Sequence, residues 1–95
     1  MAHFVLIGID KPGALELRLA NREEHLAYLA EHPGVPRLGG PFLDAEGRMA
    51  GSMLIVELAD MAAAEAFAAA DPYALAALFE RVEIRAWRPT IGVLP

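Results

Sequence analysis

The chain has 95 residues, 56% of them hydrophobic, and carries a net charge of −5. Phosphate binding needs clustered Lys and Arg side chains, whereas the 8 basic residues here are scattered, which argues against a nucleic-acid partner. The absence of cysteine excludes disulfides, thiolate nucleophiles and cysteine metal sites. No apolar stretch approaches the roughly 18 residues of a membrane span, and the N-terminus lacks the basic lead of a signal peptide, so a cytoplasmic protein without a membrane partner is predicted.

The size of the chain predicts a single domain over residues 1–95. A chain this short buries only about 60–65% of the surface that its unfolded form exposes. With so many hydrophobic residues, apolar surface remains after folding, and a partner subunit is the usual way to cover it. The composition therefore predicts self-association.

Hydrophobic periodicity and turn residues divide the chain into short elements. In chain order these are a strand over residues 3–9, a helix over 15–31, strands over 37–43 and 52–58, a helix over 60–70, a short helix over 72–79 and a strand over 82–90. Asn21 and Glu24 have the form of a capping box, which predicts that the first long helix restarts at Arg22. Asp60 is predicted to cap the second long helix, and residues 44–47 to form a hairpin turn.

The order β-α-β-β-α-β predicts an α+β, ferredoxin-like fold, in which four antiparallel strands pair in the order 4-1-3-2 with both long helices on one face. Residues 4–7 and 53–56 are apolar throughout, as in central strands, whereas the strand over 37–43 carries the glycines and proline that an edge tolerates. A strand that is apolar on both sides must be covered on both sides. We therefore expect a homodimer that buries the helix-free face of the sheet.

His25 is the first candidate for chemistry. On a helix it shares one stripe with Arg18, Arg22 and Leu29, since residues three and four apart are neighbours. Histidine is the side chain best matched to proton transfer near neutral pH, and the two arginines could serve a small anion. The structural alternative is a surface imidazole on an amphipathic helix.

Asp71 and Ser52 are further candidates with ordinary structural explanations. An aspartate before Pro72 is a common turn and helix-capping device. Ser52 follows Gly51 and could donate a hydrogen bond from a strand start, or simply be a small residue near a hairpin. No Gly-x-Ser-x-Gly elbow surrounds it, which argues against a nucleophilic-serine hydrolase.

The sequence predicts no metal ion and no cofactor. His25 and His32 share a helix face but lie two turns apart, about 10 Å, which is too far for ligand bonds of about 2 Å to a single ion. The segment Gly39-Gly40-Pro41 lacks the lysine and the following helix of a phosphate loop.

Several short segments together resemble the YCII-related (YciI-like) family. They are Arg18-Leu19-Ala20-x-Arg22-Glu23-x-His25-Leu26, Gly39-Gly40-Pro41, Gly51-Ser52 and Asp71-Pro72-Tyr73, in the order and spacing of the family. The resemblance implies a ferredoxin-like domain in a dimeric α/β-barrel-type assembly, with His25 and Asp71 as the recurrent histidine and aspartate of the family. One relative acts on chlorinated hydroquinone breakdown products, so a dehydrochlorinase-like lyase is among the implied activities.

The chain departs from this resemblance at one position. Many relatives carry a glycine shortly after the Asp-Pro-Tyr segment, where this chain has Ala77. The added Cβ is expected either to narrow a pocket or to firm the short helix.

These observations lead to one functional hypothesis and two alternatives. The hypothesis is a lyase- or isomerase-like enzyme that applies acid–base chemistry to a small anionic organic molecule, with His25 transferring the proton and Asp71 orienting it within hydrogen-bond reach in a concave pocket. The predicted substrate-binding residues are Arg18, Arg22, Ser52 and Tyr73, with either arginine holding a carboxylate or phenolate. The alternatives are a non-catalytic ligand-binding or accessory module, and a dimerisation domain without a pocket.

Overall fold

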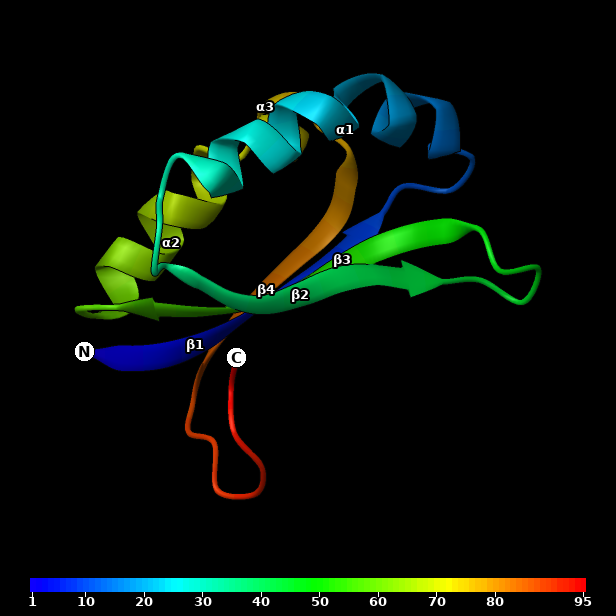
Figure 1. The fold of residues 1–95 in the computed structure, drawn as a ribbon. Coiled ribbons are helices and arrows are strands. Elements are labelled where there is room, and N and C mark those ends of the chain that lie inside the picture. Colours follow the sequence, from blue (N-terminus) through cyan, green and yellow to red (C-terminus); the bar gives the residue numbers. More distant parts are fainter.

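The computed structural model describes residues 1–95 and consists of an antiparallel sheet with all helices on one face (Figure 1). The elements are β1 (Ala2–Asp10), α1 (Leu15–Ala30), β2 (Pro36–Leu43), β3 (Met49–Leu58), α2 (Met61–Ala69), α3 (Pro72–Leu75) and β4 (Phe79–Trp87). This is the predicted β-α-β-β-α-β order, with the short α3 before the last strand. None of the helices has the length and apolar character needed to cross a membrane.

The strands pair in the order β2-β3-β1-β4, which confirms the predicted order 4-1-3-2. β1 lies between β3 and β4, and its Leu6 stands opposite Leu54 on one side and Ile84 on the other. Leu6 packs beneath the helices, whereas its neighbours Val5 and Ile7 point to the opposite face, because successive side chains of a strand alternate. The central strands are therefore apolar on both faces, as the sequence indicates.

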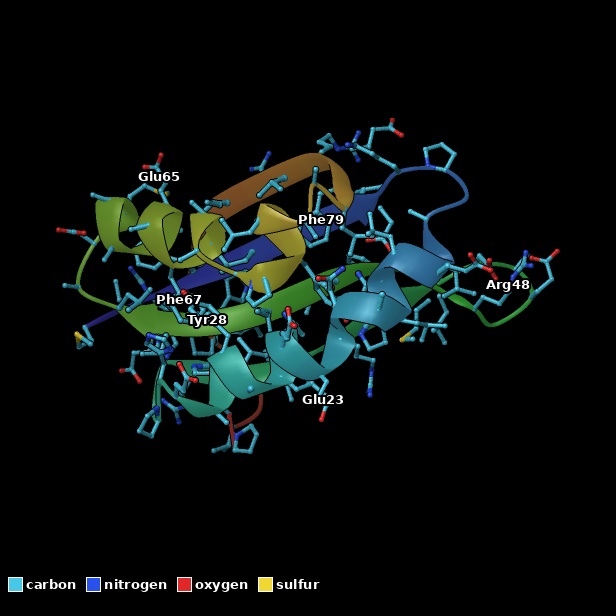
Figure 2. The ribbon with its side chains drawn as sticks, turned by 90° about the horizontal axis from the view of Figure 1, so that it is seen from above. Glu23, Tyr28, Arg48, Glu65, Phe67 and Phe79 are labelled. Atoms are coloured by element: carbon cyan, nitrogen blue, oxygen red, sulfur yellow. The ribbon has the colours of Figure 1, made fainter.

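The hydrophobic core lies between the sheet and the long helices. Its buried members are Phe4, Leu6, Leu54, Val56, Ala64 and Phe67. Tyr28 of α1 and Phe67 of α2 meet over the sheet, with ring centroids 5.0 Å apart (Figure 2). The Tyr28 hydroxyl also donates a hydrogen bond of 2.8 Å to the backbone carbonyl of Phe67, which ties the two helices together.

Helix α1 runs without interruption from Leu15 to Ala30, so the predicted restart at Arg22 is wrong. The Asn21 side chain does not cap a helix, because its Nδ2 donates to the carbonyl oxygen of Leu17 one turn earlier, at 3.0 Å. A side chain bonded in this way belongs to the interior of a helix and not to its start. The inward stripe of α1 is therefore continuous.

Two predicted turn devices are present. Asp60 caps α2, its carboxylate accepting a backbone N–H of the first turn at 2.8 Å. In the hairpin between β2 and β3, Asp44 accepts the backbone N–H groups of Glu46 and Arg48. Gly47 completes the turn with a φ of +80°, which glycine adopts at little cost.

Several boundaries differ from the prediction. β3 begins at Met49 rather than 52, α3 ends at Leu75 rather than 79, and β4 spans Phe79–Trp87 rather than 82–90. Ala77 has a φ of +58°, which turns the backbone into the left-handed region directly after α3, so the chain enters β4 early. At the start of β3, a Cβ on Gly51 would lie 2.6 Å from the carbonyl oxygen of Gly8, so only glycine permits this close pairing.

Candidate active site

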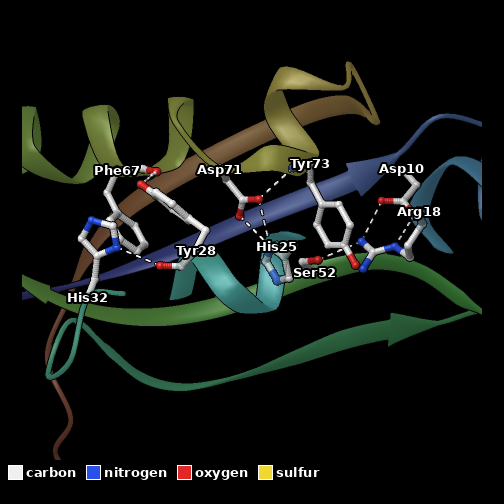
Figure 3. A network of polar contacts seen from close by, with 9 residues as sticks. All are labelled: Asp10, Arg18, His25, Tyr28, His32, Ser52, Phe67, Asp71 and Tyr73. Carbon is white, nitrogen blue, oxygen red and sulfur yellow. Dashed lines mark hydrogen bonds and ion pairs between the residues drawn. The ribbon is translucent and has the colours of Figure 1, made fainter. Parts of the chain in front are cut away.

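His25 and Asp71 meet between α1 and α3, although 46 positions separate them in the chain. The Nδ1 atom of His25 lies 2.9 Å from each carboxylate oxygen of Asp71 (Figure 3). Both residues are buried, each with 7% of its surface exposed. Because a carboxylate only accepts hydrogen bonds, Nδ1 carries a proton, and in the neutral ring Nε2 presents a lone pair.

Asp71 has a second partner. It is the N-cap of α3, and its Oδ1 accepts the backbone N–H of Tyr73 at 2.8 Å. Pro72 occupies the first position of the helix, where its missing N–H leaves no hydrogen bond unmade. The capping bond fixes the carboxylate in the orientation that meets His25, so the structural role of Asp71 and its contact with the imidazole occur together.

The other ring nitrogen of His25 faces a cavity of about 360 Å³ that lies against α1, β2 and β3. Nε2 makes no hydrogen bond within the protein. Because every buried side-chain nitrogen or oxygen has a hydrogen-bond partner, Nε2 is accessible and not buried. Nε2 therefore lies in the part of the cavity wall that His25 contributes. A bound molecule can reach this nitrogen, whereas Nδ1 is occupied by the aspartate.

The imidazole of His25 is held flat against the ring of Tyr73. Their ring centroids are 4.0 Å apart and their planes differ by 14°. The guanidinium carbon of Arg18 lies 4.6 Å from the centroid of the same tyrosine ring. Arg18, Tyr73 and His25 thus form a packed row, which limits rotation of the imidazole (Figure 3).

Arg18 is anchored in turn by residues of the sheet. Its Nε and Nη2 donate to the two carboxylate oxygens of Asp10, at 2.7 and 2.9 Å. Nη2 also donates to Ser52 Oγ at 2.8 Å, which leaves the hydroxyl hydrogen of Ser52 free for another acceptor. With only 2% of its surface exposed, Arg18 is a buried cation neutralised by one carboxylate.

The surroundings fix the protonation of two further groups. Burial alone lowers the pKa of Arg18, but the hydrogen bonds and charge of Asp10 outweigh it and raise this pKa above its ordinary value. Burial raises the pKa of the Tyr73 hydroxyl, and the charges of Arg18 and Arg22 only partly oppose it. At neutral pH the site therefore holds a permanent guanidinium beside a protonated phenol.

The cavity is lined by basic, hydroxyl and apolar groups. Its polar lining residues are Arg18, Arg22, His25, Arg37, Ser52 and Tyr73, and its larger apolar ones are Leu26, Leu29, Leu38, Met49 and Leu54. No aspartate or glutamate lines it, although the chain has 13 acidic residues against 8 basic ones. Asp71 lies behind His25, against a smaller space of about 30 Å³, and does not reach the cavity. Nowhere are three His, Asp or Glu side chains grouped to hold a metal ion.

Comparison with known proteins bears on this arrangement. The family model of the YCII-related domain matches residues 2–88. The chain belongs to the YCII-related domain family. Protein YciI of Escherichia coli is 33% identical over 93 residues, which cover 90% of this chain and 95% of that protein. An uncharacterized protein of Haemophilus influenzae is 33% identical over 94 residues, 90% of this chain and 96% of its own.

Solved structures give a similar result. A 5-chloro-2-hydroxyhydroquinone dehydrochlorinase from Burkholderia phenoliruptrix, in complex with 2,5-dihydroxybenzoquinone, is 33% identical with a TM-score of 0.85, covering 90% of this chain and 93% of that one. An antibiotic biosynthesis monooxygenase is 16% identical with a TM-score of 0.59, covering 96% of this chain and 100% of that one. The second likeness shows the ferredoxin-like fold alone.

Within this YCII-related domain, the structure distinguishes two arginines that the sequence treats alike. Arg18 is buried and bound to Asp10, so it is not free to hold an anion. Arg22 is exposed at the cavity and belongs to none of the ion pairs of the molecule. Of the two, only Arg22 retains an uncompensated charge.

Asp10 is the site residue that sequence reasoning missed, because it reads as part of the turn after the first strand. A signal for it was nevertheless present. Arg18 lies on the inward stripe of α1, and a buried charge needs a partner of opposite sign. Asp10 ends the strand that directly precedes that helix, so it was the nearest carboxylate in the chain outside the helix itself.

The expectation for Ala77 within the YCII-related family needs correction. Ala77 is exposed and lies beyond the end of α3 at Leu75, so its Cβ does not firm that helix. It does not line the cavity either. Its positive φ of 58° is the feature that favours glycine, because glycine has no Cβ to strain this conformation.

Proposed function

We propose that the protein is a small enzyme in which His25 removes a proton from a small anionic organic molecule, giving a lyase- or isomerase-type reaction. One observation carries this proposal: His25 is bound through Nδ1 to a buried carboxylate while Nε2 opens onto the cavity. A base of this kind needs an accessible lone pair and a partner that fixes the tautomer and the orientation of its ring. Asp71 supplies that partner through Nδ1.

Hydrogen-bond donors next to His25 can stabilise the negative charge that develops when the proton is removed. Proton abstraction beside a carbonyl group places negative charge on the carbonyl oxygen, and that oxygen needs hydrogen-bond donors already in position. The free hydroxyl hydrogen of Ser52 and the protonated hydroxyl of Tyr73 supply them. Because Arg18, held by Asp10, binds Ser52 and packs on the ring of Tyr73, little reorganisation of these two donors would accompany the charge development.

The proposed step is balanced within the site. The proton moves from carbon to Nε2 of His25, and the electron pair of the broken C–H bond passes to the carbonyl oxygen as an enolate. The enolate then expels a leaving group such as chloride with its bonding pair, or takes the proton back at a different carbon. The first outcome is a lyase reaction and the second an isomerisation. The dehydrochlorinase similarity at 33% identity supports the first.

Chloride release from 5-chloro-2-hydroxyhydroquinone, the substrate in the name of that relative, tests the proposal. In the keto tautomer of this molecule the carbon that bears chlorine also carries a hydrogen, so His25 would take the proton of a ring hydroxyl group. The electron pair of the broken O–H bond then passes through the ring and expels chloride with its bonding pair, which leaves a hydroxyquinone. The parent protein should release chloride, and His25→Asn should lower the rate by roughly 10²–10⁴-fold, the usual contribution of a general base. If His25→Asn keeps the parent rate, the acid–base role is wrong. If the parent binds 2,5-dihydroxybenzoquinone but turns over no hydroquinone, the ligand-binding alternative is correct instead.

We also propose that two copies pair through the helix-free face of the sheet. Val5, Ile7 and Met53 at the middle of that face are apolar and only partly covered, and Trp87 beside them is exposed. A specific interface of this kind removes about 1,200 Å² or more from water. Sedimentation at micromolar concentration should give a dimer, and Ile7→Asp should give a monomer. A monomeric parent protein would refute the pairing.

A further inference from the structure

The cavity differs in charge from the rest of the molecule. The chain as a whole is acidic, with a net charge of −5, yet every charged side chain that lines the cavity is basic. A recess lined by one sign of charge focuses its field and raises the local concentration of ligands of the opposite sign. The contrast is therefore a feature of this site and does not follow from the composition.

The three arginines of the lining are not equivalent. Arg18 is neutralised by Asp10, and Arg37 is paired with Glu57 at 2.6 Å. Arg22 makes no ion pair and no side-chain hydrogen bond, so it contributes the one uncompensated permanent charge of the cavity. The charge of Arg22 reaches the site, since it acts on the Tyr73 hydroxyl and works to lower the pKa that burial raises.

The position of Arg22 on α1 sets the distance from a bound anion to the base. Arg22 precedes His25 by three residues on an uninterrupted helix, so the two side chains start about 5–6 Å apart. Beyond His25, the stripe continues with the apolar Leu26 and Leu29, which line the cavity opposite Leu38 of β2. Leu26 and Leu38 are each nearly half exposed, so their apolar surface is available for contact with an apolar part of a ligand.

We infer that Arg22 is the anion anchor of this cavity, and that the ligand is a monocarboxylate with an apolar body. The carboxylate binds the guanidinium of Arg22 in the bidentate manner that favours arginine over lysine. The apolar body lies along Leu26, Leu29 and Leu38, and the reacting carbon sits about one helical turn from the carboxylate. A volume of about 360 Å³ suits a single ring or a short chain. This inference rests on the proposed function for the role of His25, but the binding mode itself does not.

Benzoate and benzamide, which match in shape and differ by one charge, test the inference by calorimetry. The parent protein should bind benzoate more tightly than benzamide. Arg22→Gln should weaken benzoate binding by at least about 10-fold, the effect of losing one hydrogen bond to a charged group, and should leave benzamide unchanged. Arg48→Gln removes the same charge from the exposed hairpin outside the cavity (Figure 2) and should bind both probes as the parent does.

The inference is wrong if benzoate binds the parent no better than benzamide, or if Arg22→Gln binds benzoate as well as the parent. The effect should also shrink as salt rises, because Arg22 is exposed to screening. Binding separates this result from the proposed function. A protein that holds benzoate through Arg22 but keeps full turnover after His25→Asn has the anion site without the proposed base, and the reverse pattern leaves the base without this anchor.

Discussion

His25 lies on the inner side of α1 and His32 lies just beyond the end of that helix, and the two imidazoles have different partners. His25 gives its Nδ1–H to a buried carboxylate, stacks flat on Tyr73 and opens onto the cavity. His32 gives its Nδ1–H to the backbone carbonyl of Tyr28 at 2.8 Å and meets Phe67 edge-on at 5.2 Å. Two features distinguish a candidate base from a structural histidine. The base has a carboxylate as the partner of Nδ1 and a cavity next to Nε2, whereas the structural histidine bonds to a backbone carbonyl at the end of a helix and does not line that cavity.

The largest expected effect comes from removing the charge of the His25 partner. Asp71→Asn should lower turnover by roughly 10²–10⁴-fold, because the amide can donate to Nδ1 and so shifts the proton to Nε2, the nitrogen that must accept. Asparagine caps helices as well as aspartate does, so the thermal midpoint should stay close to that of the parent. Chloride release and thermal unfolding measured together check both statements.

Asp71→Ala is the matched control, because it removes the cap as well as the charge. It should lose the same turnover and also about 1 kcal/mol of stability from the missing N-cap bond to Tyr73. A parent-like rate in Asp71→Asn would mean that the contact with His25 is structural only, and the contrast between the two histidines would then disappear.

His32→Ala tests the other half of the comparison. It removes the hydrogen bond to the Tyr28 carbonyl and the edge contact with Phe67, so the free energy of unfolding should fall by about 1–2 kcal/mol. For a domain of this size, each kcal/mol lowers the thermal midpoint by about 4–8 °C. Turnover measured below the transition should equal that of the parent. A loss of turnover without a loss of stability would show that His32 belongs to the active site.

The fold followed from local patterns in the sequence, whereas the choice of His25 and Asp71 as a pair also drew on the resemblance to the YCII-related family. The apolar runs of β1 and β3 predict central strands, and the three-residue spacing of Arg22 and His25 predicts a shared helix face. The meeting of His25 with Asp71 required more, since helix lengths decide it and sequence defines them only to within about 2–4 residues. The predicted element boundaries were wrong where the conformation of one residue interrupts a helical pattern. Ala77 does this just after α3, because its backbone is in the left-handed region.

The role of Asp10 as the partner of Arg18 was not predicted from local sequence patterns, for a different reason. Its contact with Arg18 crosses from the end of β1 to the first half of α1, and the turn residues around it offer a complete alternative explanation. The unpaired state of Arg22 was likewise unpredictable, because it depends on which carboxylates fold away from the cavity. The sequence thus identified Arg18 and Arg22 as candidates. Only the packing of α1 on the sheet shows that Arg18 is a buried structural cation and that Arg22 is free.

Tyr28, which is half-buried, and Tyr73, which is buried, extend the comparison to alkaline pH. Burial raises the pKa of Tyr28, aided by the charge of Asp71, and burial also raises that of Tyr73, where Arg18 and Arg22 oppose the rise. A phenol whose pKa is raised on folding contributes stability that is present below about pH 10, its unfolded value, and is lost as the pH rises through the folded value.

Stability of the parent should therefore fall as the pH rises above about 10. Tyr28→Phe and Tyr73→Phe should each flatten this fall, because each removes one phenol whose pKa is raised on folding. Urea unfolding at a series of pH values measures both slopes. If neither variant flattens the curve, burial does not hold these two phenols in their protonated form.

The smallest expected effect is that of a substitution at Ala77, in the turn between α3 and β4. An alanine with a φ of +58° costs about 1–2 kcal/mol relative to a right-handed conformation, and glycine avoids that cost. Glycine also makes the unfolded chain more flexible, which offsets about 0.4–1 kcal/mol of the gain. Ala77→Gly should therefore stabilise the protein by about 0.5–1 kcal/mol, a rise of a few degrees in the thermal midpoint. Because Ala77 is exposed and lines no wall of the cavity, turnover and benzoate binding should not change. A lower midpoint would mean that the left-handed turn is supported by contacts of the alanine methyl group, and a change in turnover would mean that α3 transmits the strain to Asp71.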